Sequence, residues 1–459
     1  MKQTKSEKII SLTIISMGFF LVSLDVTVVN VALSQLKQDL GISISGLQWV
    51  IDAYTLSFAT LLLSAGKAGD ITGPKKIFCC GLLLFSVASL LCGIAHSLSF
   101  LVIARILQGT GAALLVANSL SLIQGIFSQP PERAKAFGIW GGVGGIAIAM
   151  GPVAGGILIS RFGWQAAFFL NIPVGVLSLA MALKYLPEIA TVPRKINPLA
   201  QLLIAVALAS LAWAFITAGY DGWLSATVIT SGLLCIAAIT GFIFYEITSE
   251  IPLLPRGIFR IKKFAAATSI GLIINSGFYG QLFIISLYFQ QIKHYTTLHS
   301  GLALLPQAII MAATAFCCGR IIARTGPGIP VLAGLSVSFI GLLWLSLIPT
   351  NSSYIGVMIP MLLTGMGMSL TAPATVAACM AEAPLGQGGI TSGIINTARQ
   401  SGSVLGVAMA GSFMGDQNLS LHSMHLALLA TLPFYLLAWC LALRWLLPKS
   451  TFIPLPEPE

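Results

Sequence analysis

Residues 138–156 read GIWGGVGGIAIAMGPVAGG and form the most distinctive stretch of the chain. Small residues recur in this stretch at steps of three or four: Gly138, Gly142, Gly145, Ala149, Pro152 and Gly156. At the pitch of an α-helix these positions make one narrow stripe with almost no side chains. Small residues let membrane helices approach closely, and Pro152 removes a backbone donor and bends the helix. The stripe therefore predicts a bent membrane helix packed tightly against a neighbour.

The composition indicates a protein that lies almost entirely in a membrane. The chain has 459 residues, of which 56% are hydrophobic and 8% charged, and its mean hydropathy is +0.93. Soluble domains carry about 25% charged residues. The net charge of +10 comes from basic residues scattered between apolar segments. Membrane topology explains that scatter better than nucleic-acid binding does.

Apolar segments long enough to cross a bilayer, about 20 residues each, determine the predicted fold class. They predict an all-α integral membrane protein with fourteen transmembrane helices. The expected spans are residues 9–33, 46–65, 77–96, 99–123, 136–160, 166–186, 199–218, 225–246, 264–289, 300–323, 329–348, 354–380, 391–413 and 422–447.

Basic residues predict the orientation of these spans, because they favour cytoplasmic loops. With the N-terminus in the cytoplasm, only Lys37, Arg161 and Lys293 fall outside. Arg105 and Arg399 fall within the membrane, and all other members of the 24 basic residues are cytoplasmic. We therefore expect an even number of spans and two cytoplasmic termini.

An internal repeat predicts two similar halves. Residues 66–74, GKAGDITGP, are echoed by residues 319–327, GRIIARTGP, and Gly81 then aligns with Gly334. Two repeated six-helix bundles are typical of transporters. The spans 199–218 and 225–246 are then an insertion. The predicted domains are residues 1–190 (first bundle), 191–255 (two-helix insert) and 256–459 (second bundle).

Charged residues inside the spans are candidates for function because each is costly in a bilayer. They are Asp25, Asp52, Arg105 and Arg399. Burial disfavours the charged form of a carboxylic acid, so such a group can bind and release a proton near neutral pH. We assign Asp25, Asp52 and Arg105 to proton or substrate coupling. The alternative is a structural ion pair between an acid and an arginine.

Two further groups of residues are candidates for substrate contact and for conformational control. The candidates for the wall of a substrate cavity are Asn30, Tyr54, Gln108, Asn275, Tyr279, Asn396 and Arg399. The predicted loop between the second and third spans can form a latch that holds one conformation, or it is an ordinary solvated turn. Its candidate residues are Gly66, Lys67, Asp70, Gly73, Lys75 and Lys76.

The sequence favours neither an enzyme nor an ATP-driven pump. No glycine-rich loop ends in Gly-Lys-Ser or Gly-Lys-Thr, the pattern that binds nucleotide phosphates. The eight cysteines fall in apolar spans without metal-ligand spacing to histidine. We expect no metal and no cofactor.

Five strings in chain order resemble the fourteen-span drug:proton antiporters of the major facilitator superfamily. They are residues 24–33 (LDVTVVNVAL), the segment 66–76, residues 105–111 (RILQGTG), the stretch 138–156, and the segment 163–175. In the fifth helix the matching antiporter residues are Gly138, Gly142, Gly145, Gly151, Pro152, Gly155 and Gly156.

The resemblance implies alternating-access export of small amphipathic compounds, such as drugs, antibiotics and toxic cations, driven by the proton gradient. Asp25 is then the proton and substrate carboxyl, Arg105 assists the proton, and Gly151 with Pro152 seals a helix interface. The implied location is the bacterial cytoplasmic membrane, and the expected partners are protons, a small-molecule substrate and lipid, with the chain acting as a monomer. Rival functions are a dedicated exporter of one cell-made metabolite (a siderophore or antibiotic), a proton-coupled importer, and a receptor without transport.

Overall fold

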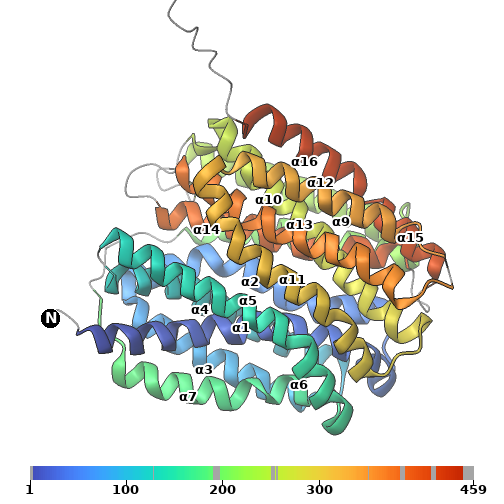
Figure 1. The fold of residues 1–459 in the computed structure, drawn as a ribbon, viewed down its shortest axis with the longest axis horizontal. Helices are drawn as coiled ribbons and strands as arrows, with labels where there is room; N and C mark the ends of the chain where they lie inside the picture. Colours follow the sequence, from blue (N-terminus) through green and yellow to red (C-terminus); the bar gives the residue numbers. More distant parts are fainter. Residues whose placement is uncertain are drawn as a thin grey trace, which may run out of the picture.

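The computed structural model describes residues 4–127, 129–189, 197–249, 254, 257–349, 351–382, 388–414 and 420–447. These residues form helices joined by short turns, and they contain no β-strand (Figure 1). Ser or Thr side chains cap the starts of many helices, which satisfies backbone N–H groups that would otherwise lack partners.

The helices fall into three groups along the chain. The first comprises α1 (Lys5–Leu40), α2 (Ile44–Thr72), α3 (Pro74–Gly93), α4 (Leu98–Ile126), α5 (Pro130–Phe162), α6 (Ala166–Phe169) and α7 (Asn171–Tyr185). The second comprises α8 (Pro198–Asp221) and α9 (Ala226–Thr248). The third comprises η1 (Ile258–Arg260), α10 (Lys262–Leu287), η2 (Tyr288–Ile292), α11 (Thr297–Thr325), α12 (Gly328–Leu345), α13 (Tyr354–Ala381), α14 (Gly388–Ser412), α15 (Leu421–Leu429) and α16 (Leu432–Trp445).

Every span expected from the sequence coincides with a helix or with a pair of short helices. Among the described residues, 13 helical segments are long and apolar enough to cross a membrane; α6 with α7 forms one of them, and α15 with α16 forms another. The remaining expected span, residues 391–413, coincides with α14, which is 25 residues long but is not among the 13. The all-α membrane fold is confirmed.

Several helices extend beyond the apolar segments that predicted them. The first span was expected to end at residue 33, but α1 continues to Leu40, where Gly41 in the left-handed conformation (φ 62°) ends it. The segment 66–76 was expected to be a loop, and this is wrong: α2 continues to Thr72 and α3 begins at Pro74. Apolar windows detect only the part of a helix that lipid surrounds.

The same sharp connection appears in both halves of the chain. Gly73, with φ 102°, joins α2 to α3, and Gly326, with φ 74°, lies between α11 and α12. Such positive φ angles favour glycine. Gly109 of α4 lies against α2, and Gly365 of α13 lies in the same way against α11. The repeated sequence therefore builds a repeated helix arrangement.

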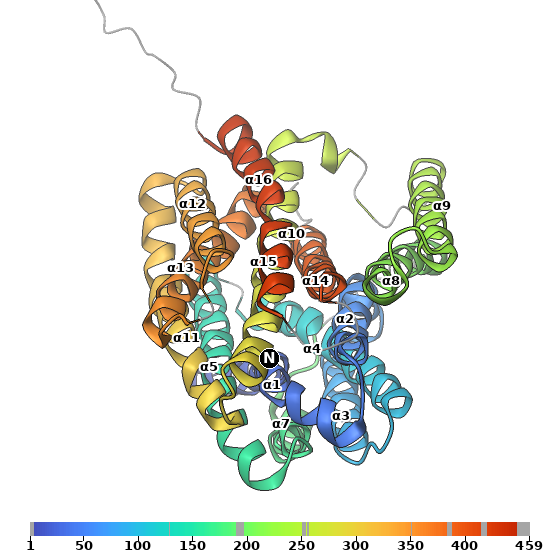
Figure 2. The same cartoon turned by 90° about the vertical axis from the view of Figure 1, so that its right-hand side faces the viewer.

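The inserted helices α8 and α9 stand at one flank of the molecule. In Figure 2, α8 lies beside α2 and α14, with α9 outside it, and α8 contacts both α2 and α14. The predicted domain boundaries, between residues 190 and 191 and between residues 255 and 256, lie outside the described residues. The division into three domains stays a prediction.

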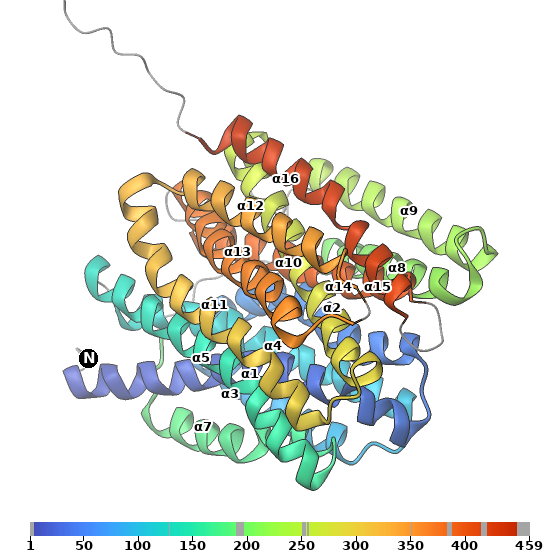
Figure 3. The same cartoon turned by 45° about the vertical axis from the view of Figure 1, so that its right-hand side comes forward.

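The small-residue stripe of α5 divides into a packed part and an open part. Near Gly156, α5 crosses α11 (Figure 3): a Cβ at Gly156 would lie 3.2 Å from Leu298, and one at Gly301 would lie 2.1 Å from the carbonyl of Pro152. Gly138, Gly142 and Gly145, by contrast, have open space within 4 Å of an added Cβ. The expectation of close packing along the whole stripe is therefore wrong, because no neighbouring helix reaches the stripe at these three glycines.

Gly109 generates a prediction about stability. A Cβ there would lie 2.2 Å from the backbone oxygen of Tyr54, so α2 and α4 would have to move apart. We expect Gly109→Ala to destabilise the folded protein by about 1–3 kcal/mol. Gly142→Ala is the matched control, because open space surrounds that position. Thermal unfolding in detergent measures both, and equal melting temperatures would contradict this packing.

Candidate functional site: a buried ion pair beside a central cavity

A buried ion pair joins α1 to α4. Asp25 of α1 is 0% exposed and Arg105 of α4 is 1% exposed, and Arg105 Nη1 donates to Asp25 Oδ2 at 2.6 Å. Two charges in an apolar interior are stable only when each has a partner and further hydrogen bonds. The contact thus brings together two of the sequence-predicted coupling residues.

Neutral side chains complete the hydrogen bonding of the carboxylate. Gln108 Nε2 and Asn171 Nδ2 both donate to Asp25 Oδ1, at 2.8 and 2.9 Å. Arg105 Nη1 also donates to Gln108 Oε1 at 2.7 Å. Ser89 of α3 accepts from Gln108 at 2.9 Å. Asp25, Ser89, Arg105, Gln108 and Asn171 are called the Asp25 network below. Arg105, Gln108 and Asn171 all donate to Asp25, so both of its carboxyl oxygens have hydrogen-bond partners.

Ser89 and Asn171 were not among the sequence-predicted site residues. Asn171 is the first residue of α7, where the chain breaks between two helices, and Pro173 follows it closely. That break turns the Asn171 side chain into the bundle. A polar residue at a helix break inside an apolar span is a signal that could have identified it.

The remaining surfaces of the Arg105 guanidinium are also occupied. Its Nε donates to the backbone carbonyl of Val50 at 2.9 Å, which ties α4 to α2. The guanidinium carbon lies 4.2 Å from the ring centroid of Tyr54 and 5.8 Å from that of Phe168. Cation–π contacts of this kind are stronger when water is excluded. Arg105 is therefore fixed in one position from several helices.

A small cavity lies on the other side of Arg105, between the two halves of the molecule. Four sequence-predicted residues line it: Asn30, Tyr54, Arg105 and Tyr279. The other lining residues are Val26, Val29, Ile51, Thr55, Gln400, Ser403 and Val407. Arg105 is thus shared between the Asp25 network and the cavity wall.

The other predicted cavity residues do not line this cavity. Gln108 belongs to the Asp25 network. Asn275 is buried and donates to the carbonyl of Gly271 within its own helix. Asn396 and Arg399 are partly buried on α14, and an added Cβ at Gly271 would lie 3.3 Å from the Arg399 side chain.

Asp52 lies apart from the Asp25 network. It is 0% exposed, and neither carboxyl oxygen has a hydrogen-bond partner among the described residues. Gln48, one turn earlier, donates to Ala408 of α14, and Trp49 contacts Trp213 of α8. Asp52 follows on that side of α2, so it faces the junction of α2 with α8 and α14. The orientation of Asp52 about the axis of α2 thus separates it from Asp25. Residue spacing along the sequence gives the depth of a residue in the membrane but not this orientation.

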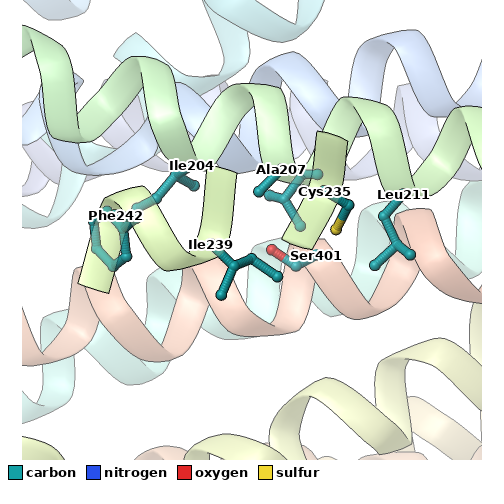
Figure 4. A pocket seen from close by; sticks show the side chains of 8 residues that line it. Ile204, Ala207, Leu211, Cys235, Ile239, Phe242 and Ser401 are labelled. Carbon is teal, nitrogen blue, oxygen red and sulfur yellow. The ribbon is translucent and has the colours of Figure 1, made fainter. Parts of the chain in front are cut away.

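A second hollow lies between the inserted helices and α14. Figure 4 shows its lining, in which Ser401 of α14 faces apolar side chains of α8 and α9. Those side chains belong to Ile204, Ala207, Leu208, Leu211, Cys235, Ile239 and Phe242. This apolar surface supplies no charged group for substrate or proton binding.

The predicted latch residues lie at the connection between α2 and α3. Gly66, Lys67 and Asp70 belong to the last turns of α2, Gly73 is the link, and Lys75 and Lys76 open α3. Asn118 of α4 supports this end of α2 by donating to the carbonyl of Ala65 at 3.0 Å. The latch role stays a prediction.

Known proteins resemble this chain over almost its whole length. The family model of the Major Facilitator Superfamily matches residues 15–407. A methylenomycin A resistance protein of Bacillus subtilis is 33% identical over 411 residues, which are 89% of this chain and 88% of that protein. Multidrug resistance protein Stp of Mycobacterium tuberculosis is 32% identical over 89% of this chain and 76% of its own length. A crystal structure of a POT family transporter in complex with a thioalcohol-conjugated peptide superimposes with a TM-score of 0.71 at 12% identity, covering 95% of this chain and 96% of that one.

The ion pair generates a prediction about stability. Asp25→Asn or Arg105→Gln alone leaves a buried charge without its partner, and we expect each to cost about 3–5 kcal/mol. The double variant Asp25→Asn with Arg105→Gln should be more stable than either, because both charges are gone. Thermal unfolding of the three variants measures this.

The Lys263–Glu382 bridge supplies the control. Its N–O distance is 3.4 Å and the Lys263 side chain is 60% exposed, so Lys263→Gln should cost less than about 1 kcal/mol. The Asp25→Asn, Arg105→Gln double variant also gives the contradicting outcome. If its loss of unfolding free energy equals the sum of the losses in the two single variants, Asp25 and Arg105 do not act as a unit.

Proposed function

Since the chain belongs to the Major Facilitator Superfamily and is a membrane transporter rather than an enzyme, we propose that it exports small amphipathic compounds, antibiotics among them, in exchange for protons. The family supplies the class of protein, and its resistance-protein relatives supply the export direction and the kind of cargo. The proton coupling rests on the geometry of the site.

The observation that carries the coupling is the double role of Arg105. It pairs with Asp25 on one side and lines the cavity on the other. A proton that binds Asp25 removes the negative charge that holds Arg105, so the arginine can then move or accept a new partner. Substrate that displaces Arg105 would leave the Asp25 carboxylate without its charged partner, so substrate binding and proton binding are linked. Proton and substrate thus compete through one side chain.

Alternating access is supported by the uneven contact between the halves. The halves touch where α5 crosses α11 near Gly156 and have open space around Gly142. With the N-terminus in the cytoplasm, the Gly156 end is outside and the open end is inside. This arrangement is then an inward-facing state that receives cargo from the cytoplasm.

The setting follows from the same proposal. The chain works in the bacterial cytoplasmic membrane with both termini inside, as its basic residues indicate. Each chain encloses its own ion pair and cavity, which suits a monomer. The proton gradient supplies the energy, with no bound cofactor. Asp52 is a second group that can take up a proton, since its carboxyl oxygens have no hydrogen-bond partner among the described residues.

A drug-susceptibility panel tests the proposed function. The gene is expressed in a host that lacks its own drug pumps, and growth is compared with that of cells carrying the empty vector. We expect protection against several structurally different amphipathic compounds. Protection against a single compound would indicate a dedicated exporter, and increased sensitivity would indicate an importer.

Asp25→Asn tests the coupling. In proteoliposomes with an imposed pH gradient, we expect this variant to transport a compound identified by the panel no faster than empty liposomes do. Asp39→Asn is the matched control: the same change on the same helix at an exposed position near its end, where full activity is expected. Gradient-driven transport by Asp25→Asn at the wild-type rate would overturn the assignment.

A further inference from the structure

Close packing between α10 and α14 helps to position a second arginine inside the membrane spans, the partly buried Arg399. A Cβ at Gly402 would lie 2.0 Å from the carbonyl of Leu272, so the backbones of α10 and α14 are in close contact there. On α14, Gln400 and Ser403 face the central cavity. Arg399 lies between that face and the side that packs on α10, next to Gly271.

Among the residues that the structure describes, no carboxylate pairs with Arg399. Of the acidic residues that the structure describes, Asp25 and Asp52 occupy the middle of a helix, and the others lie near or just beyond helix ends. Asp25 forms its ion pair with Arg105, and the carboxyl oxygens of Asp52 have no hydrogen-bond partner among the described residues. Arg105 is therefore neutralised beside the cavity, whereas Arg399 is a net positive charge.

The hydrogen-bonding groups of Arg399 are also incompletely used. Its Nε is buried and has no hydrogen-bond partner among the described residues. The nearby polar group is the phenol of Tyr279, which interacts electrostatically with Arg399 and lines the cavity. A guanidinium offers donors in a planar fork that matches the two oxygens of a carboxylate. An anion is the kind of partner that these unused donors fit.

We propose that Arg399 binds a carboxylate of the transported compound, so that the substrates are amphipathic acids or zwitterions. The inference rests on the proposed export function and adds the substrate class to it. Tyr279, Gln400 and Ser403 would supply further hydrogen bonds from the cavity wall. The carboxylate of the compound would neutralise Arg399 as Asp25 neutralises Arg105.

Binding of two matched dyes tests this inference. Tetramethylrhodamine carries a free carboxylate, and its methyl ester has the same aromatic body without that charge. Fluorescence anisotropy with purified protein in detergent gives both dissociation constants without any gradient. We expect the acid to bind at least about tenfold more tightly than the ester, the range of a charge-assisted hydrogen bond.

Variants of Arg399 separate recognition from structure. Arg399→Gln should abolish the preference for the acid, while Arg399→Lys should retain part of it. Arg324→Gln is the control for net charge, because it removes an exposed arginine at the end of α11 and should change neither constant. If the role of Arg399 is purely structural, Arg399→Gln should weaken the binding of both dyes equally and leave the ratio of their dissociation constants unchanged.

Three results would overturn the inference: no preference for the acid in the wild-type protein, binding of neither dye, or a preference that survives Arg399→Gln. None of them bears on proton-coupled export, which the resistance panel and the Asp25 variant test separately. Loss of resistance or of gradient-driven transport would, in turn, leave the measured acid-to-ester ratio unchanged.

Discussion

The structure depends on the pairing of Asp25 with Arg105 in a region from which lipid and protein exclude water. Neither charge can remain there alone, so the surrounding helices are arranged to supply partners. Gln108 and Asn171 donate further hydrogen bonds to the Asp25 carboxylate, and the carbonyl of Val50 accepts one from Arg105. Glycines such as Gly109 let the backbones come close enough for these short contacts. In the proposed mechanism the same side chains serve stability and transport, because a proton that binds Asp25 would loosen the contacts that hold the helices.

The two halves share an arrangement but differ in charge. At an offset of 256 residues, Gly109 corresponds to Gly365, and by the same offset Asp25 corresponds to Gln281 and Gln108 to Thr364. Gln281 and Thr364 meet each other and Gln307 in a buried cluster without a charge, with donor–acceptor distances of 3.0 to 3.1 Å. The first half therefore carries the ionisable network, and the second half repeats its packing with neutral amides and a hydroxyl.

The sequence predicted the features that have a high energetic cost in a membrane. Apolar windows located the spans, and the rarity of intramembrane charge singled out Asp25 and Arg105, which do meet. Contacts that depend on helix rotation could not be predicted in this way. Asp52 was grouped with Asp25 by depth, yet its oxygens bond to no described residue, and Gln48 and Trp49 on the preceding turn contact α14 and α8. Asn171 was missed because the search considered charged residues, although a polar residue at a helix break inside an apolar span was a usable signal. Residue spacing also does not reveal which part of the α5 stripe is packed and which part is open.

The central claim is that substrate and proton compete through Arg105, and proton exchange on substrate binding tests it most directly. A compound against which the chain protects cells is added to purified protein in weakly buffered detergent, and a pH-sensitive dye reports protons released or taken up. The account predicts an exchange of about one proton per bound molecule in the wild-type protein and none in Asp25→Asn. An equal exchange in the two proteins, or none in either despite binding, would contradict it.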